Sequence, residues 1–184
     1  MKIRKLSVLL RSLFLASLLA MFFVAAASAT TINVGNGFIP ELGSTTTVSI
    51  TLDEAPDGLS GYTITVSLSD PDIAEITAVE FPSWASINDN SDLPADSFWM
   101  KAADLNRQVE PGATNIQLGT LTIRGDANGE CEINVTIDRL DDDSGYRIDA
   151  VVSPGTLKVG PTAAVFHVTS EGDGLADGPY YGQE

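Results

Sequence analysis

The sequence has 184 residues, with 25 acidic and 10 basic side chains and a formal net charge of −15 at pH 7. All 25 acids but only six basic residues lie after position 29, so residues 30–184 carry a net charge of −19. Such a charge repels nucleic acid phosphates and anionic lipid surfaces, which excludes both as partners.

The first 29 residues have the pattern of a secretory signal peptide. Basic residues precede an apolar stretch from about Leu13 to Ala27, and Ala27-Ser28-Ala29 is a small-x-small cleavage site. We therefore expect cleavage after Ala29 and a secreted, extracellular protein, with the cell surface as another destination. The alternative is an uncleaved anchor, since the apolar stretch is almost long enough to span a bilayer. We expect no membrane insertion of the mature chain.

From residue 31 onward, apolar and polar residues alternate with the period of half-buried β-strands. In Thr47–Leu52, for example, Val48, Ile50 and Leu52 share one face. The alternation slips around Gly119, which predicts a β-bulge. Nine strands are predicted, at residues 31–34, 47–52, 62–68, 74–81, 97–103, 114–124, 131–138, 146–152 and 156–159.

Turn signals separate these short strands, and helical periodicity is absent after residue 29. This pattern is typical of an all-β fold, and we predict a single β-sandwich over residues 30–160. Residues 161–184 are rich in Gly, Asp and Glu and are predicted to form a short disordered tail.

The sequence offers little for catalysis. Its single histidine, His167, lies in the tail, so a Ser-His-Asp triad and a histidine-based metal site are excluded from the sandwich. The acids fall at turns rather than in apolar stretches that would raise their pKa. Cys131 is the only cysteine and begins an alternating strand, where a thiol behaves as a small hydrophobe. We predict a protein that is not an enzyme and has no cofactor.

The segment DRLDDDSGYRIDA carries the densest group of acids. The run DDDSG separates two alternating strands, which predicts a hairpin turn. Its spacing does not fit an EF-hand, because Gly145 falls at position 5 when Asp141 is position 1. A calcium site of another type, made from Asp141, Asp142 and Asp143, remains the alternative to a solvated turn.

Three further features suggest a ligand or a modification. Trp84 and Trp99 could stack on sugars, and the alternative is that they pack in the core or against loops. If residues 97–103 are extended, either Phe98 or Trp99 must point outward. Asn134-Val135-Thr136 is an N-glycosylation sequon on the outward phase of its strand, although such a tripeptide also occurs by chance.

A series of short motifs follows the predicted strands. The early part has a polar strand, a loop, a GL-x-GY sequence, an alternating strand and a D-P turn. Later come an L-x-T-L-T-x-x-G strand and a closing x-G-x-L-x-V strand. The residues of these motifs are Gly58-Leu59, Gly61-Tyr62, Asp70-Pro71, Ile76–Phe81, Leu118–Gly125 and Ser153–Val159. In this order they resemble a cohesin domain of the kind found in archaeal secreted proteins.

The resemblance implies a nine-stranded jelly-roll sandwich that docks a dockerin-like protein module through one sheet face. In that family, docking gathers enzymes on a scaffold, typically for polysaccharide breakdown. The family's dockerin-contacting residues follow no motif that can be matched here by position, so none is transferred.

Three functions therefore stay open. The first is a secreted cohesin-type module that docks a protein through an outward strand face, with Thr63, Thr65 and Ser67 as candidates. The second is a carbohydrate-binding module for polysaccharide or cell-wall glycan, which requires accessible aromatic rings at Trp99, Tyr62 or Trp84. The third is a structural domain of the cell surface. Fold alone does not decide among them.

Overall fold

The computed structural model describes residues 29–161. These residues form eleven strands and no helix, and therefore no helix long and apolar enough to cross a membrane. The signal peptide and the acidic tail predicted from the sequence lie outside the described residues. The strands are β1 Thr30–Val34, β2 Gly37–Ile39, β3 Thr45–Ala55, β4 Gly61–Leu68, β5 Ala74–Glu80, β6 Ile87–Asn90, β7 Ser97–Ala103, β8 Ala113–Gly125, β9 Gly129–Asp141, β10 Ala150–Ser153 and β11 Gly155–Val159.

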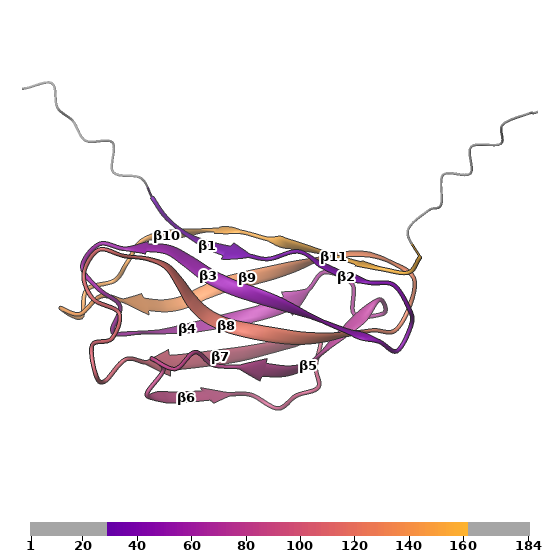
Figure 1. Cartoon of the computed structure of the whole chain (residues 1–184), viewed down its shortest axis with the longest axis horizontal. Helices are drawn as coiled ribbons and strands as arrows, with labels where there is room; N and C mark the ends of the chain where they lie inside the picture. Colours follow the sequence, from indigo (N-terminus) through magenta and orange to yellow (C-terminus); the bar gives the residue numbers. More distant parts are fainter. Residues whose placement is uncertain (1–28, 162–184) are drawn as a thin grey trace, which may run out of the picture.

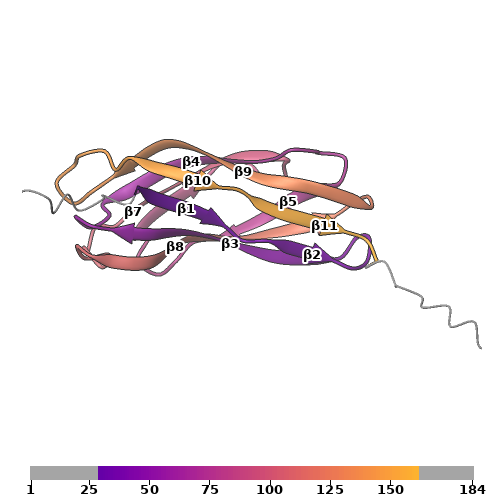
Figure 2. The ribbon, with the colours of Figure 1, turned by 90° about the horizontal axis from the view of Figure 1, so that it is seen from above.

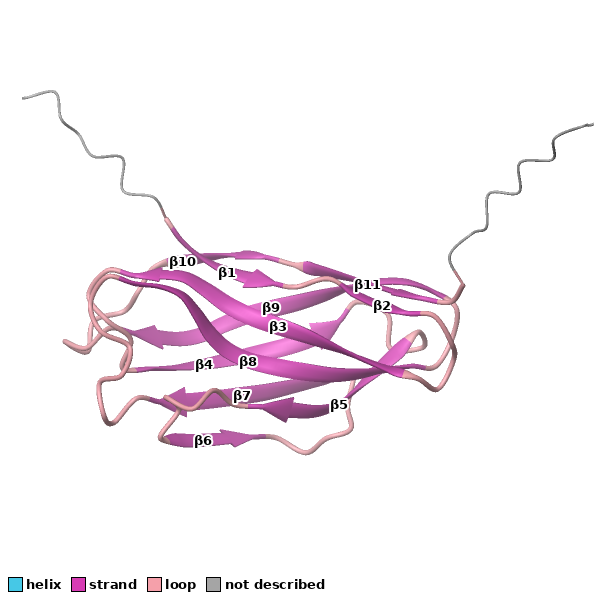
Figure 3. Cartoon of the chain, in the orientation of Figure 1, coloured by secondary structure: helices cyan, strands magenta, loops and turns pink. Residues whose placement is uncertain are grey.

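Two sheets pack face to face, which confirms the predicted β-sandwich (Figures 1 and 3). One sheet has the strand order β10-β1-β3-β8-β5, and the other has the order β2-β11-β9-β4-β7-β6. Seen from above, β8 of the first sheet and β9 of the second lie on opposite sides of the molecule, and β10 and β11 run on from one another between them (Figure 2). Alternation along each strand fills the space between the sheets with apolar side chains, among them Ile50, Ile64, Met100, Leu121 and Ile133.

One long edge of the sandwich is closed by two chain segments that cross between the sheets together. β1 pairs in parallel with β10 in the five-stranded sheet, and β2 pairs in parallel with β11 in the six-stranded sheet. At the crossing, a Cβ atom on Gly155 would lie 2.2 Å from the carbonyl oxygen of Gly35. Only glycine permits this approach, which lets both segments change sheets at the same point.

The predicted strands are confirmed, with one error at a boundary and two omissions. The strand predicted from Tyr146 begins only at Ala150, because residues 142–149 form an extended turn instead. β2 is three residues long, and β6 reads Ile-Asn-Asp-Asn, so neither displays an alternating pattern. The predicted bulge is present: Ile50 pairs with Gly119 and Thr51 with Gln117, which leaves Leu118 as the extra residue.

Candidate functional site

The outer surface of strands β9, β4, β7 and β6 gathers the most varied side chains, and we call it the mixed face. Thr63, Thr65 and Ser67 on β4 point outward and are half-buried, as the alternation predicted. In the strand register they lie opposite Lys101, Trp99 and Ser97 of β7, respectively. On their other side they lie opposite Arg139, Thr136 and Asn134 of β9.

Pairwise contacts order the centre of the mixed face. The Lys101 ammonium lies 4.8 Å from the centroid of the Trp99 ring and 3.0 Å from a carboxylate oxygen of Asp89 on β6. The Thr65 hydroxyl donates a hydrogen bond of 2.8 Å to the Asp138 carboxylate. These contacts bring an aromatic ring, a cation and two acids together on neighbouring strands.

A hollow of about 270 Å³ lies at one end of the mixed face. Gly61 leaves room there because it has no side chain, and Tyr62 and Thr63 continue the lining along β4. Ile87, which is 57% exposed, lines the hollow from β6. The charged side chains of the lining are those of Lys101, Arg139 and Asp141.

Two of the three aromatic residues considered for sugar stacking are buried. Trp84 is 8% exposed and packs edge-on against Tyr62, with the ring centroids 6.1 Å apart. Its indole nitrogen donates to the carbonyl oxygen of Gln117, and the Tyr62 hydroxyl donates to that of Leu118. Burial raises the pKa of Tyr62 well above its ordinary value. Tyr62 and Trp84 therefore do not offer the accessible ring that sugar stacking needs. Of the three aromatic residues, Trp99 alone lies on a surface.

The acidic run at 141–143 forms a turn in which the carboxylates take different partners. Asp142 is buried, and one of its oxygens accepts hydrogen bonds from the backbone nitrogens of Ser144 and Tyr146, at 2.8 and 2.9 Å. Asp141 forms an ion pair with Arg139. Within residues 29–161, no three His, Cys, Asp or Glu side chains gather where they could hold a metal ion. The Asp142 carboxylate thus organises the turn.

Asn134 and Cys131, which the sequence analysis considered individually, both lie on β9. Asn134 of the sequon is half-buried on the mixed face, in register with Ser67, so a glycan attached there would cover this surface. Cys131 is a free, buried cysteine, and burial is the main cause that raises its thiol pKa, with the nearby negative charge of Asp70 adding to it. A thiol that stays protonated is a poor nucleophile, which agrees with a packing role.

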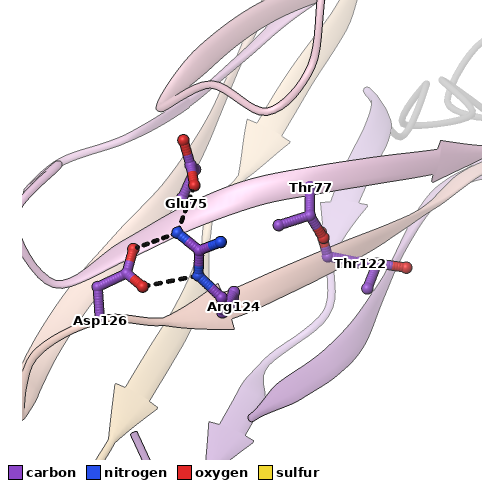
Figure 4. Close-up of polar contacts among 5 residues, drawn as sticks. All are labelled: Glu75, Thr77, Thr122, Arg124 and Asp126. Atoms are coloured by element: carbon purple, nitrogen blue, oxygen red, sulfur yellow. Dashed lines mark hydrogen bonds and ion pairs between the residues drawn. The ribbon is translucent and has the colours of Figure 1, made fainter. Parts of the chain in front are cut away.

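The outer surface of the other sheet carries Ser and Thr side chains at its centre, and we call it the hydroxyl face. Thr47 and Ser49 on β3 lie opposite Thr122 and Thr120 on β8. Charged side chains lie toward the end and the edge of this face, where Arg124 forms ion pairs with Glu75 at 2.6 Å and Asp126 at 2.8 Å. Thr77 and Thr122 lie beside this cluster (Figure 4). The hydrogen bond and the charge of Asp126 are the main causes that raise the pKa of Arg124.

The arrangement of the strands can be compared with that of known proteins. No family model matches the chain, and no curated protein matches it. Solved structures do match. A non-cellulosomal cohesin from the archaeon Archaeoglobus fulgidus matches with 18% sequence identity and a TM-score of 0.58. The match covers 72% of this chain and 91% of the archaeal chain. The chain has the cohesin fold.

Two bacterial structures lead to the same fold. A type I cohesin–dockerin complex from Clostridium thermocellum has a TM-score of 0.61 at 10% identity and covers 72% of this chain and 99% of the matched one. The seventh ScaB type I cohesin from Pseudobacteroides cellulosolvens has a TM-score of 0.60 at 14% identity, with 76% and 97% covered. The cohesin resemblance found in the sequence is thus confirmed at the level of fold.

Sequence analysis missed part of the mixed face of this cohesin fold. Lys101 could have been found, because it lies two residues after Trp99 and therefore on the same side of an extended strand. Asp89 and Ile87 could not have been found in this way. They belong to a short polar segment, and nothing in its sequence predicts that this segment pairs with β7. Arg139 lies next to the bulge of β9 near Asp138, where simple alternation fails.

Proposed function

We propose that this chain is a secreted, non-catalytic binding module that docks a protein partner of dockerin type through the mixed face. The cohesin fold supports the proposal, because a matched cohesin of the same fold was solved in complex with a dockerin. The proposed setting is an extracellular assembly, with polysaccharide breakdown as its purpose.

The observation that carries the choice of surface is the contrast between the two outer faces. Tryptophan and arginine are enriched among the residues that dominate binding energy, whereas serine and threonine are under-represented. Trp99, Lys101 and Arg139 all lie on the mixed face. The centre of the hydroxyl face holds small neutral side chains of Ser and Thr, so it offers no comparable anchor.

A carbohydrate-binding function is less well supported. Sugar stacking needs open aromatic faces, and Trp99 is the single candidate left of the three. Its ring is already approached by the Lys101 ammonium, which would compete with a sugar for the π-face.

Matched substitutions on the two faces test the docking proposal. Thr65 and Thr122 are both half-buried threonines in central strands, but they lie on opposite faces. Residues 30–184 would be immobilised as wild type, Thr65→Lys and Thr122→Lys. They would be offered purified dockerin modules, secreted proteins from the same source with identification by mass spectrometry, and insoluble polysaccharides.

We expect a discrete protein to be retained by the wild type and by Thr122→Lys. For Thr65→Lys the affinity should fall at least about tenfold, which corresponds to about 1.4 kcal/mol. An equal loss of affinity in both variants, or a loss only in Thr122→Lys, would exclude the mixed face as the docking surface. Retention on a polysaccharide that disappears in Trp99→Ala would replace protein docking with carbohydrate binding.

A further inference from the structure

The hollow over Gly61 has a chemical character unlike the rest of the molecule. Its charged lining consists of Lys101, Arg139 and Asp141, and Asp89 forms an ion pair with Lys101 beside it. Residues 30–184 as a whole carry a net charge of −19. An anionic group that approaches this protein is therefore repelled by the chain as a whole, and the two cations of the hollow oppose that repulsion locally.

The charges at the hollow are already arranged, but they are open to a further partner. Arg139 contacts Asp141 through Nε, and its side chain is 68% exposed, whereas that of Asp141 is 17% exposed. The acid thus lies beneath the cation, and the guanidinium has donors left for a second acceptor. The Lys101–Asp89 pair is about half exposed on both sides, and such surface pairs contribute little and exchange readily.

The remaining lining is apolar and positioned by the backbone. Ile87 of β6 lies opposite Ala103 of β7, which in turn lies opposite Gly61 of β4. An isoleucine that is 57% exposed beside an alanine and a glycine leaves an apolar surface without a covering side chain. A Cβ atom at Gly61 would lie 2.6 Å from the carbonyl oxygen of Ala102, so the close approach of β4 and β7 requires glycine at this position of the lining.

We propose that this hollow receives an aliphatic side chain that a docked protein presents beside a carboxylate. The aliphatic group would cover Ile87 and Ala103, and the carboxylate would lie between Lys101 and Arg139. The inference rests on the proposed docking function and specifies the chemistry of the partner: an acidic surface with an aliphatic residue at its centre. Charge complementarity selects this partner over a basic one, despite the strongly acidic character of the chain as a whole.

A small carboxylate tests the hollow without any protein partner. Isotopically labelled residues 30–184 would be titrated with 4-methylpentanoate and followed by the amide signals of Gly61, Thr63 and Ala103. The matched probes are 4-methylpentanamide, which has no charge, and 4-methylpentylamine, which has the opposite charge. We expect saturable shifts at these three amides, and about fivefold tighter binding of the carboxylate than of the amide.

Variants separate the two parts of the hollow. Arg139→Gln should lower the affinity for the carboxylate to that of the amide, and Ile87→Asn should weaken both. Lys158→Gln is the matched control, because Lys158 is an exposed cation of β11 in the same sheet, away from the hollow. It should leave all affinities unchanged, and a loss of affinity in this variant equal to that of Arg139→Gln would overturn the proposal.

The outcome is independent of the pull-down. If a protein is retained by the mixed face but 4-methylpentanoate produces no saturable shift, docking stands and the hollow proposal is overturned. Tighter binding of the amine than of the carboxylate would also overturn it. Saturable carboxylate binding that Arg139→Gln abolishes would support the hollow, even where the pull-down retains no protein.

Discussion

At the scale of single residues, buried polar groups act as links between elements. Tyr62 of β4 belongs to the six-stranded sheet, and its hydroxyl donates to the carbonyl oxygen of Leu118 in the bulge of β8. Trp84 makes the same kind of link from a loop to Gln117. Both aromatic rings can therefore be buried without an unsatisfied donor, because each donates to a backbone carbonyl of the bulged strand.

Tyr62→Phe removes the hydroxyl and leaves the Leu118 carbonyl without this donor. We expect the free energy of unfolding to fall by about 1 kcal/mol at pH 7, as measured by urea denaturation. The wild type should also lose stability above about pH 10, because the unfolded chain then releases the tyrosine proton while folded Tyr62, with its raised pKa, retains it. The phenylalanine variant should lack this alkaline loss, so the two stabilities should converge. A constant difference between them at all pH values would contradict the assignment.

Asp142 and Asp143 test which acid organises the turn after β9. Asp142 is buried and accepts two backbone hydrogen bonds, whereas Asp143 is only partly buried. We expect Asp142→Ala to lower the free energy of unfolding by about 1–2 kcal/mol. Asp142→Asn, which keeps an acceptor oxygen, should cost less, and Asp143→Ala should change stability by less than about 0.5 kcal/mol.

The same variants can be titrated with calcium by calorimetry. Heat that vanishes in Asp143→Ala would point to a metal site in the turn instead.

At the scale of elements, the pairing of neighbouring strands brings together the residues that line the hollow of the mixed face. β4 pairs with β7 over seven residues, from Gly61 opposite Ala103 to Ser67 opposite Ser97. The sequence of β6 is polar and only four residues long, so β6 forms only because β7 has a free edge with which it can pair. The hollow thus depends on the pairing of three strands, of which β6 has little intrinsic tendency to form.

Gly61→Ala tests the fit between β4 and β7. A Cβ atom there would lie 2.6 Å from the Ala102 carbonyl oxygen, so the backbone of one strand must shift. We expect a loss of about 1–3 kcal/mol in urea denaturation, together with large amide shifts along β7 in the NMR spectrum. Gly43→Ala is the control, because Gly43 lies in a left-handed turn with open space around its Cβ position. It should cost about 1 kcal/mol with no change in β7. Unchanged β7 signals in Gly61→Ala would show that the approach is looser than described.

At the scale of the whole molecule, net charge opposes the compact state. Residues 30–184 carry −19, and ion pairs among the described residues engage only Lys101, Arg124 and Arg139. Self-repulsion of this kind is long-range and is therefore screened by salt, whereas the apolar core is not.

We therefore expect the free energy of unfolding to rise with sodium chloride concentration up to about 1 M, where the Debye length is about 3 Å. Urea denaturation at a series of salt concentrations measures this effect. A titration with sucrose serves as the control, because it favours compact states without screening charge. Stability that is flat or falls with added sodium chloride would show that attractive ion pairs outweigh the repulsion.

The sequence by itself determined the fold class, nine of the eleven strands and the bulge near Gly119, because alternation and turn chemistry are local properties of the chain. It also placed Thr63, Thr65 and Ser67 on the outside of β4. Only the tertiary structure decided that Trp84 is buried, that β6 joins β7, and that Lys101 and Arg139 flank one hollow. Those features depend on pairing between distant segments and on the packing of two sheets, and neither leaves a periodic trace in the sequence.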